Sequence, residues 1–87
     1  MVALNRVVMS DLGRQKYLEV DLDGSELTPE HTVGQTIEHY LGHMRIPDNG
    51  LPWRASSRGV MLDSKRRLKE LEPADHEWTV IPEVSAG

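Results

Sequence analysis

The chain has 87 residues, a net charge of −4 with histidine neutral, and no cysteine. This length supports one domain and leaves no room for a second core, so any catalytic cleft would be shallow. The lack of cysteine excludes a disulfide framework, a thiol nucleophile and a cysteine metal site, and the acidic charge argues against nucleic acid or an anionic membrane as the main partner.

The beginning of the chain predicts two strands. Residues 6–10 carry a β-branched apolar run, and residues 17–22 alternate between apolar and polar side chains, which is the period of a half-buried strand. Residues 11–16 join them in a short segment that contains Gly13. A segment of this length and composition predicts a turn, so we expect the chain to open with a β-hairpin.

The middle of the chain predicts a helix. Thr32 and Gln35 match a capping box, in which the threonine hydroxyl accepts a backbone hydrogen bond and the glutamine side chain reaches back. We expect the helix to end at Ile46-Pro47, because the residue before a proline is pushed out of the helical conformation. Apolar residues with a helical period follow the cap, and they are Val33, Ile37, Tyr40, Leu41 and Met44.

The remaining segments predict further strands. Residues 53–56 form a short strand with Trp53 and Ala55 inward, residues 60–62 form a small edge strand, and residues 78–81 form the closing strand before Pro82. In the closing strand we expect Trp78 to point into the core. These elements together indicate an α+β domain, with a four- to five-stranded mixed sheet packed on one main helix.

The chain ends in a short segment, residues 83–87, that has little to bury. Fully extended, its five residues reach about 17 Å. The last residue, Gly87, has no Cβ, so a narrow active site has room for the terminal carboxylate. A frayed terminus is the alternative interpretation of the same segment.

The order of these elements, together with particular residues, resembles the ubiquitin-like β-grasp family across nearly the whole chain. The resemblance implies a β-grasp domain over residues 1–82 and a flexible tail over residues 83–87. The residues that carry it are Thr32-Val33 at the start of the helix, Ile46-Pro47 at its end, Gly59, Leu62-Asp63, Leu68, Leu71 and the closing strand.

The resemblance also implies a function. Conjugated members of the family end in a glycine whose carboxylate is adenylated by an E1-like activating enzyme and then passed as a thioester to an E2-like conjugating enzyme. A bacterial ubiquitin-like modifier of this kind would use Gly87, preceded by Ala86 where ubiquitin has a second glycine. A deconjugating protease would be a further partner. The implied partner surface consists of Leu12, Arg54, Ser56, Ile81, Glu83 and Val84, in which Ser56 leaves Leu12 and Ile81 as the apolar members.

Two other functions fit a β-grasp fold. An unconjugated subunit, such as the small subunit of a multicomponent monooxygenase or a ubiquitin-like protein of type VII secretion, would bind through its sheet and leave the tail idle. A sulfur carrier would use the same carboxylate as a thiocarboxylate, although such carriers end on paired glycines.

The sequence contains no motif that predicts catalysis or metal binding by this protein. His39 and His43 stand four residues apart on the predicted helix, and a zinc site would need a third ligand such as Glu38. No metalloprotease signature and no glycine-framed serine accompany them. Gly13 and Gly24 stand alone and form no phosphate-binding loop. We therefore expect a protein that is not an enzyme and has no cofactor and no metal.

The sequence also lacks signs of export. Residues 1–6 show no basic region followed by a long apolar run, and no segment approaches the roughly 18 apolar residues of a membrane span. The one basic cluster, residues 65–69, is followed at once by Glu70 and Glu72, which is typical of a solvated surface. We expect a cytoplasmic protein that binds neither nucleic acid nor membrane.

Overall fold

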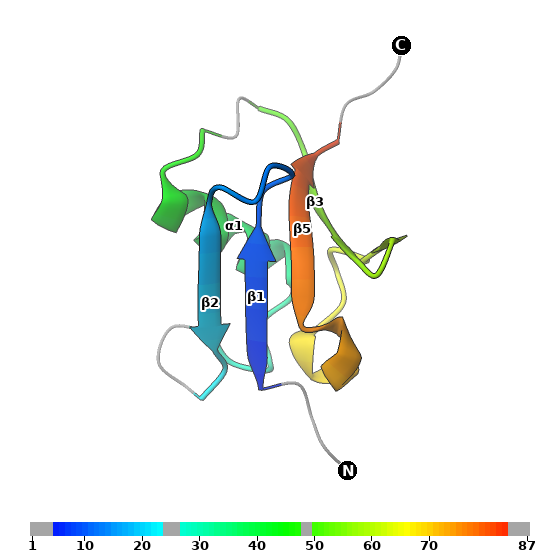
Figure 1. Cartoon of the computed structure of the whole chain (residues 1–87). Coiled ribbons are helices and arrows are strands. Elements are labelled where there is room, and N and C mark those ends of the chain that lie inside the picture. The colour runs from blue at the N-terminus through cyan, green and yellow to red at the C-terminus, as the bar shows by residue number, and fades with distance from the viewer. Residues whose placement is uncertain (1–4, 24–26, 48–49, 84–87) are drawn as a thin grey trace.

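Figure 1 shows the computed structural model of the chain, which describes residues 5–23, 27–47 and 50–83. Five strands form one sheet in the order β2-β1-β5-β3-β4. The helix and strands are β1 (Arg6–Ser10), β2 (Tyr17–Asp21), α1 (Val33–Met44), β3 (Trp53–Ser57), β4 (Val60–Met61) and β5 (Glu77–Pro82), and two short 3₁₀ turns, Leu68–Glu70 and Pro73–Asp75, precede β5.

The sheet is mixed. Its central strands, β1 and β5, run parallel, whereas the β1–β2, β5–β3 and β3–β4 pairs are antiparallel. Because β1 and β5 run in the same direction, the turn that follows β1 lies at the end of the sheet where β5 finishes (Figure 1). This topology brings residues 11–16 beside the residues that lead into the C-terminus.

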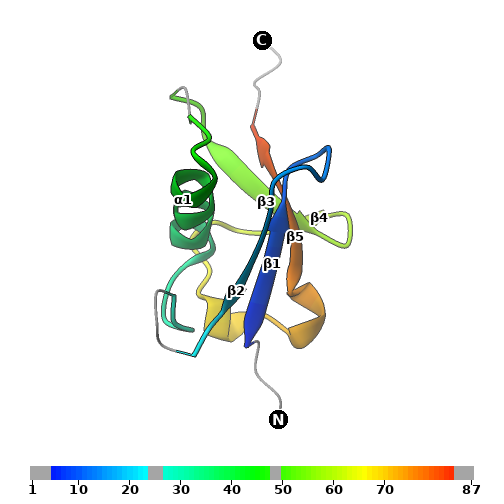
Figure 2. The ribbon, with the colours of Figure 1, turned by 60° about the vertical axis from the view of Figure 1, so that its left-hand side comes forward.

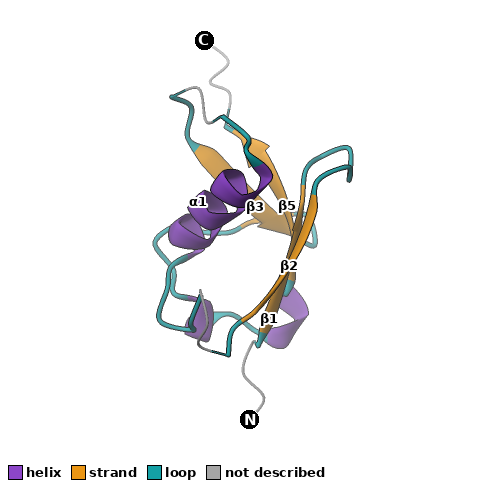
Figure 3. Ribbon diagram, turned by 90° about the vertical axis from the view of Figure 1, so that its left-hand side faces the viewer, coloured by secondary structure: helices purple, strands orange, loops and turns teal. Residues whose placement is uncertain are grey.

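Helix α1 covers one face of the sheet (Figures 2 and 3). The predicted capping box is confirmed: the backbone N–H of Gln35 donates to Thr32 Oγ1 at 3.1 Å, and the N–H of Thr32 donates to Gln35 Oε1 at 2.9 Å. The helix ends at Arg45, which adopts a left-handed conformation with φ 56°. Among the described residues, no helix is both long and apolar enough to cross a bilayer.

The core lies between the helix and the inner face of the sheet. The alternation predicted for the strands is confirmed: Trp78 is 1% exposed, and its indole N–H donates to the Asp75 carbonyl at 2.7 Å. The other inward strand residues are also buried, and they are Val7, Met9, Val20, Ala55 and Val80. The predicted α+β class, with a mixed sheet on one main helix, therefore describes the molecule.

Strand β5 is longer than predicted at both ends. Its pairing with β3 continues through Pro82, and the N–H of Glu83 donates to the Pro52 carbonyl at 2.7 Å. Hydrogen-bonded and non-hydrogen-bonded pairs alternate along an antiparallel ladder. Glu83 and Pro52 are hydrogen-bonded, so the neighbouring pair, Trp53 and Pro82, exchanges no backbone hydrogen bonds. Pro82 is therefore tolerated in the strand although it has no N–H to donate.

Candidate functional site

The candidate site is the end of the molecule where β5 finishes. Of the residues to which the sequence assigned a role, Val84, Ala86 and Gly87 lie outside the described residues. The structure describes the chain as far as Glu83, together with the surfaces around it. Those surfaces determine what a partner would meet as it approached the C-terminal segment.

Glu83 is held by two interactions at this end. Its backbone donates to Pro52, and its carboxylate oxygen Oε2 lies 3.6 Å from Arg54 Nη1. Arg54 also donates from Nη2 to the Leu62 carbonyl at 3.2 Å, while its buried Nε has no partner among the described residues. The structure therefore brings together Arg54 and Glu83, two of the predicted partner-binding residues. Such a half-exposed ion pair contributes at most about 1 kcal/mol to the stability of the domain.

An apolar groove of about 540 Å³ lies beside this point. Leu12 and Ile81, which the sequence assigned to one surface, both line it. Leu12 is 80% exposed, and together with its neighbours it forms a contiguous apolar surface rather than a single exposed side chain. Ile46 and Trp53 line the same groove and add to its apolar wall. The groove therefore adds apolar side chains from the helix side of the sheet to the two that the sequence assigned.

Trp53 reaches this groove because of its position in the strand. The sequence predicted an inward side chain at this strand position, and the residue does face the helix side of the sheet. It lies at the start of β3, however, where the core ends, so it is only half-buried. In the sequence, this half-buried position was indicated by a large aromatic residue at the first position of a predicted strand.

The turn that carries Leu12 is fixed by hydrogen bonds. Asp11 Oδ1 accepts from the backbone N–H groups of Gln15 at 2.7 Å and Lys16 at 3.1 Å. The bond from Lys16, followed by that from Gln15, lowers the pKa of Asp11. The hydroxyl of Tyr40 donates to the Lys16 carbonyl at 2.6 Å, which ties the turn to helix α1. Burial, together with the negative charge of Asp11, raises the pKa of Tyr40 to about 12, so this donor keeps its proton at neutral pH.

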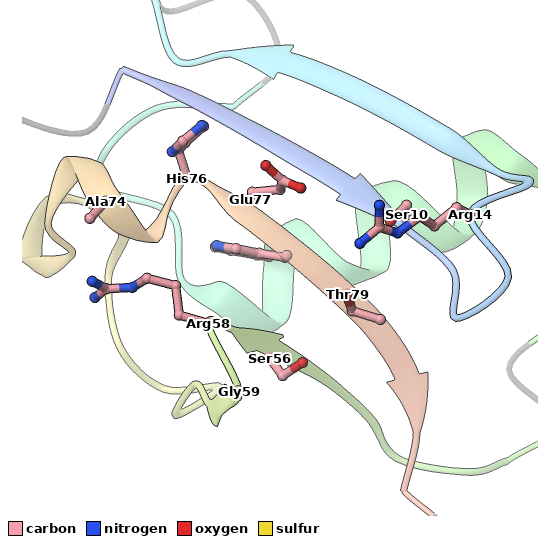
Figure 4. Close-up of a pocket in the computed structure, with 10 residues that line it drawn as sticks. Ser10, Arg14, Ser56, Arg58, Gly59, Ala74, His76, Glu77 and Thr79 are labelled. Carbon is pink, nitrogen blue, oxygen red and sulfur yellow. The ribbon is translucent and has the colours of Figure 1, made fainter.

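The outward face of the sheet carries a second hollow, an open cavity of about 400 Å³ (Figure 4). Ser56, the remaining predicted partner-binding residue, lies here rather than in the apolar groove. It is the cross-strand neighbour of Thr79, which in turn pairs with Ser10. Ser56 still shares the outward face with Arg54 and Ile81, which form the next outward pair of the same two strands.

Two arginines at this cavity were not predicted from the sequence. Arg14 and Arg58 line it from the turns after β1 and β3, and both have positive φ, 57° and 53°. Arg58 is followed by Gly59, with φ 80°, in a two-residue turn of the type that usually contains Asn-Gly. An arginine at a position that favours asparagine was the signal available in the sequence.

The helix histidines do not form a metal centre with the described residues. The rings of His39 and His43 are stacked with centroids 6.1 Å apart. Within residues 5–23, 27–47 and 50–83, no three histidine, aspartate or glutamate side chains are arranged to hold a metal ion. The pair faces strand β2, away from the groove beside Glu83.

Comparison with solved structures identifies the fold. The chain is similar to a ubiquitin from Caldiarchaeum subterraneum, with 19% sequence identity and a TM-score of 0.68, over 99% of this chain and 100% of the ubiquitin. No protein-family profile and no curated protein sequence matches it. The chain therefore has the ubiquitin-like β-grasp fold, as the order of its elements predicted.

Proposed function

We propose that this chain, a ubiquitin-like β-grasp protein, is a protein modifier whose reactive group is the Gly87 carboxylate. Residues 1–82 are the recognised domain and residues 83–87 are the tail. The carboxylate attacks the α-phosphate of ATP in an E1-like activating enzyme and releases pyrophosphate. An enzyme thiolate then displaces AMP to form a thioester, which passes to an E2-like enzyme and finally to a target amine or hydroxyl. The chain itself catalyses no step and binds no cofactor or metal.

The observation that carries this proposal is the combination of a ubiquitin-like fold over the whole chain with a glycine-ended segment leaving β5. A transferred carboxylate must pass the walls of an adenylating site and then meet a thiolate. A side chain on the last residue would collide there, and glycine has none. Other proteins with this fold act without conjugation, so the fold alone does not decide the function.

The surfaces around Glu83 support the same proposal. A partner enzyme that draws the tail into its active site must also grip the domain from which the tail leaves. The groove beside Leu12 and Ile81 presents half-buried apolar side chains at that place, and burying them provides most of the binding energy. Glu83, paired with Arg54, places a carboxylate at the first residue of the tail, where a partner enzyme could recognise it. Ubiquitin has basic residues in its tail, whereas this chain has Pro82 and Glu83 there. We therefore expect a dedicated activating enzyme.

The experiment is a search for covalent adducts in the native host. The chain is expressed with an N-terminal epitope tag, and lysates are resolved under denaturing, reducing conditions. The wild-type chain is expected to give tagged species of higher mass. Deletion of Gly87 removes the carbonyl from its position and Gly87→Val adds bulk beside it, so both should abolish these species while leaving stability within about 0.5 kcal/mol. Ala86→Gly is the matched control and should retain them.

The alternative, an unconjugated binding subunit, predicts the opposite pattern. Truncation after Pro82 would leave activity intact, whereas Arg54→Glu or Ile81→Asp would weaken partner binding. Adducts that persist without Gly87, or full activity of the Gly87 deletion in the host, would exclude the modifier function. A cytoplasmic location, and the absence of nucleic acid and membrane partners, belong to the proposal as well.

A further inference from the structure

The outward face of the sheet carries hydroxyl groups where an apolar patch is absent. Ser10, Thr79 and Ser56 occupy directly paired positions on β1, β5 and β3. Adjacent strands lie about 4.8 Å apart, so the three side chains form a row of about 10 Å across the sheet. Each residue is half-buried. The described part of the chain provides no hydrogen-bond partner for any of the three hydroxyls, so all of them are available to a ligand.

Arg14 stands at one end of this row (Figure 4). It is held in the left-handed region with φ 57°, which is unfavourable for a residue with a Cβ. Its backbone N–H closes the turn by donating to the Asp11 carbonyl at 3.0 Å. Its guanidinium, by contrast, pairs with none of the described residues. Nothing within the described domain therefore accounts for an arginine side chain at this strained position.

The second arginine of the cavity differs in this respect. Arg58 Nη2 lies 2.8 Å from Asp75 Oδ1, and Ser57 Oγ donates to the same oxygen at 3.3 Å. Arg58 is therefore explained by the contact that ties the β3–β4 turn to the segment before β5. Its charge is largely neutralised by Asp75, which leaves Arg14 as the cation available to a ligand.

The next outward position along β5 carries a carboxylate. Glu77 lies on β5 two residues before Thr79, on the same outward face, and its carboxylate forms no ion pair with the described residues. His76 stands next to it, with Nδ1 3.0 Å from the Pro73 carbonyl. The face thus has an unpaired cation beside the hydroxyl row and, among the described residues, an unpaired carboxylate one outward position further along β5. Figure 4 shows Arg14 beside Ser10, and Glu77 on the side of the row toward His76.

We propose that this face binds an extended segment of a protein partner that sets a carboxylate against Arg14 and a cationic side chain toward Glu77. A guanidinium pairs with a carboxylate through two parallel hydrogen bonds, and the hydroxyls of Ser10 and Thr79 complete the polar contacts. One guanidinium beside neutral hydroxyls balances a single negative charge. A doubly charged phosphate would carry excess charge toward Glu77, so the face favours a carboxylate.

This interaction does not depend on Gly87. The surface lies on the outward face of the sheet, whereas the groove beside Leu12 and Ile81 lies where β5 ends. A partner held at the outward face is recognised by charge and hydroxyl contacts. Either proposal can therefore fail while the other stands.

The test is an NMR titration of the full ¹⁵N-labelled chain with the peptide acetyl-Glu-Ser-Lys-amide, in which the Glu and Lys side chains lie on the same face of an extended backbone. We expect amide shifts to change at Ser10, Arg14 and Thr79, and the apparent affinity to fall at least threefold when acetyl-Gln-Ser-Lys-amide replaces the probe. Arg14→Gln should produce a similar loss. Arg45→Gln is the matched control, because Arg45 is also an exposed arginine with positive φ but caps the helix, and it should leave binding unchanged.

Four results would overturn the proposal. Equal affinity for the two peptides would show that the protein does not recognise the carboxylate of the peptide. Shifts centred on Leu12 and Ile81 would assign the peptide to the apolar groove. Tighter binding of inorganic phosphate than of the Glu peptide would make the face a phosphate site instead. If Arg14→Gln disturbs the turn, Thr79→Val replaces it as the test variant, and unchanged peptide affinity in a folded Thr79→Val protein would contradict the role of the hydroxyl row.

Discussion

The two faces of the sheet are formed by the same five strands, but packing constrains the side chains of only one of them. The inward face packs Trp78 and Val80 against helix α1 and leaves them about 1% exposed. The outward face presents Glu77, Thr79 and Ile81 from the same strand, none of them fully buried. The inward residues are constrained by the core, because the fold requires their volume and apolarity. The outward residues are not needed for packing, so their chemistry is free to reflect what the protein binds.

Replacement of the largest core side chain tests this comparison most strongly. Trp78→Ala removes a fully buried indole and its hydrogen bond to Asp75, so it should lower the free energy of unfolding by about 3–5 kcal/mol. A loss of that size unfolds much of so small a domain. Urea denaturation followed by circular dichroism measures it.

The neighbouring residue supplies the control. Thr79→Val changes an outward position in the same strand and keeps a β-branched side chain, so its stability should stay within about 0.5 kcal/mol of the wild type. If the two variants were destabilised equally, the outward face would also belong to the packed structure, and the contrast between the faces would be lost.

The contact between the helix and the β1–β2 turn is expected to have the next largest effect. Tyr40→Phe removes the donor to the Lys16 carbonyl and should cost about 1.5 kcal/mol. The raised pKa of Tyr40 adds a pH dependence. Because the unfolded tyrosine ionises near pH 10 and the folded one near pH 12, this stabilisation is complete below about pH 10 and is lost as the pH rises to about 12. Denaturation midpoints from pH 8 to 12 should fall for the wild type and change less for Tyr40→Phe.

The helix cap gives a smaller effect. Thr32→Ala removes the acceptor for the Gln35 N–H and should lower stability by about 1 kcal/mol without changing the fold. Thr32→Ser keeps the hydroxyl and is the matched control. A denaturation midpoint for Thr32→Ala that equals the wild-type value would contradict the role of the capping box.

The smallest effect concerns the turn that carries both Leu12 and Arg14. The pKa of Asp11 is lowered by the N–H of Lys16 and then that of Gln15. Its ionised form therefore stabilises the turn above the ordinary aspartate pKa of about 3.9, and this contribution is lost as the pH falls through the lower folded pKa. The amide shifts of Gln15 and Lys16 should move together with a midpoint below pH 3.9, and Asp11→Ala should remove that transition. A midpoint above that pH would mean that these hydrogen bonds do not form in solution.

The inward face could be predicted from the sequence, and much of the outward face could not. Strict alternation in residues 17–22 and the Thr32–Gln35 cap are local patterns, and each leads directly to one structure. The outward cavity depends on non-local pairing, because Ser10 meets Thr79 only through the parallel contact of β1 with β5. The positive φ of Arg14 is set by the turn and not by the residue type, so no propensity rule indicates it.

The apolar groove also depends on contacts between segments that are distant in the sequence. Ile46 was identified as the residue that ends the helix and Trp53 as a core residue, and both assignments follow from local patterns. Their shared contribution to the groove arises because the end of α1 and the start of β3 meet Ile81 at one end of the sheet. Only the folded arrangement shows that these residues form one surface with Leu12.

Bonding of the Gly87 carboxylate to other proteins can be detected by mass spectrometry of purified adducts. The last lysine or arginine of the chain is Lys69, so trypsin would leave residues 70–87 as a branch on each modified target peptide. We expect target peptides that carry this branch through the Gly87 carbonyl, and none from cells that express the Gly87 deletion. Adducts joined through any other residue, or tagged species that contain no branched peptide, would contradict it.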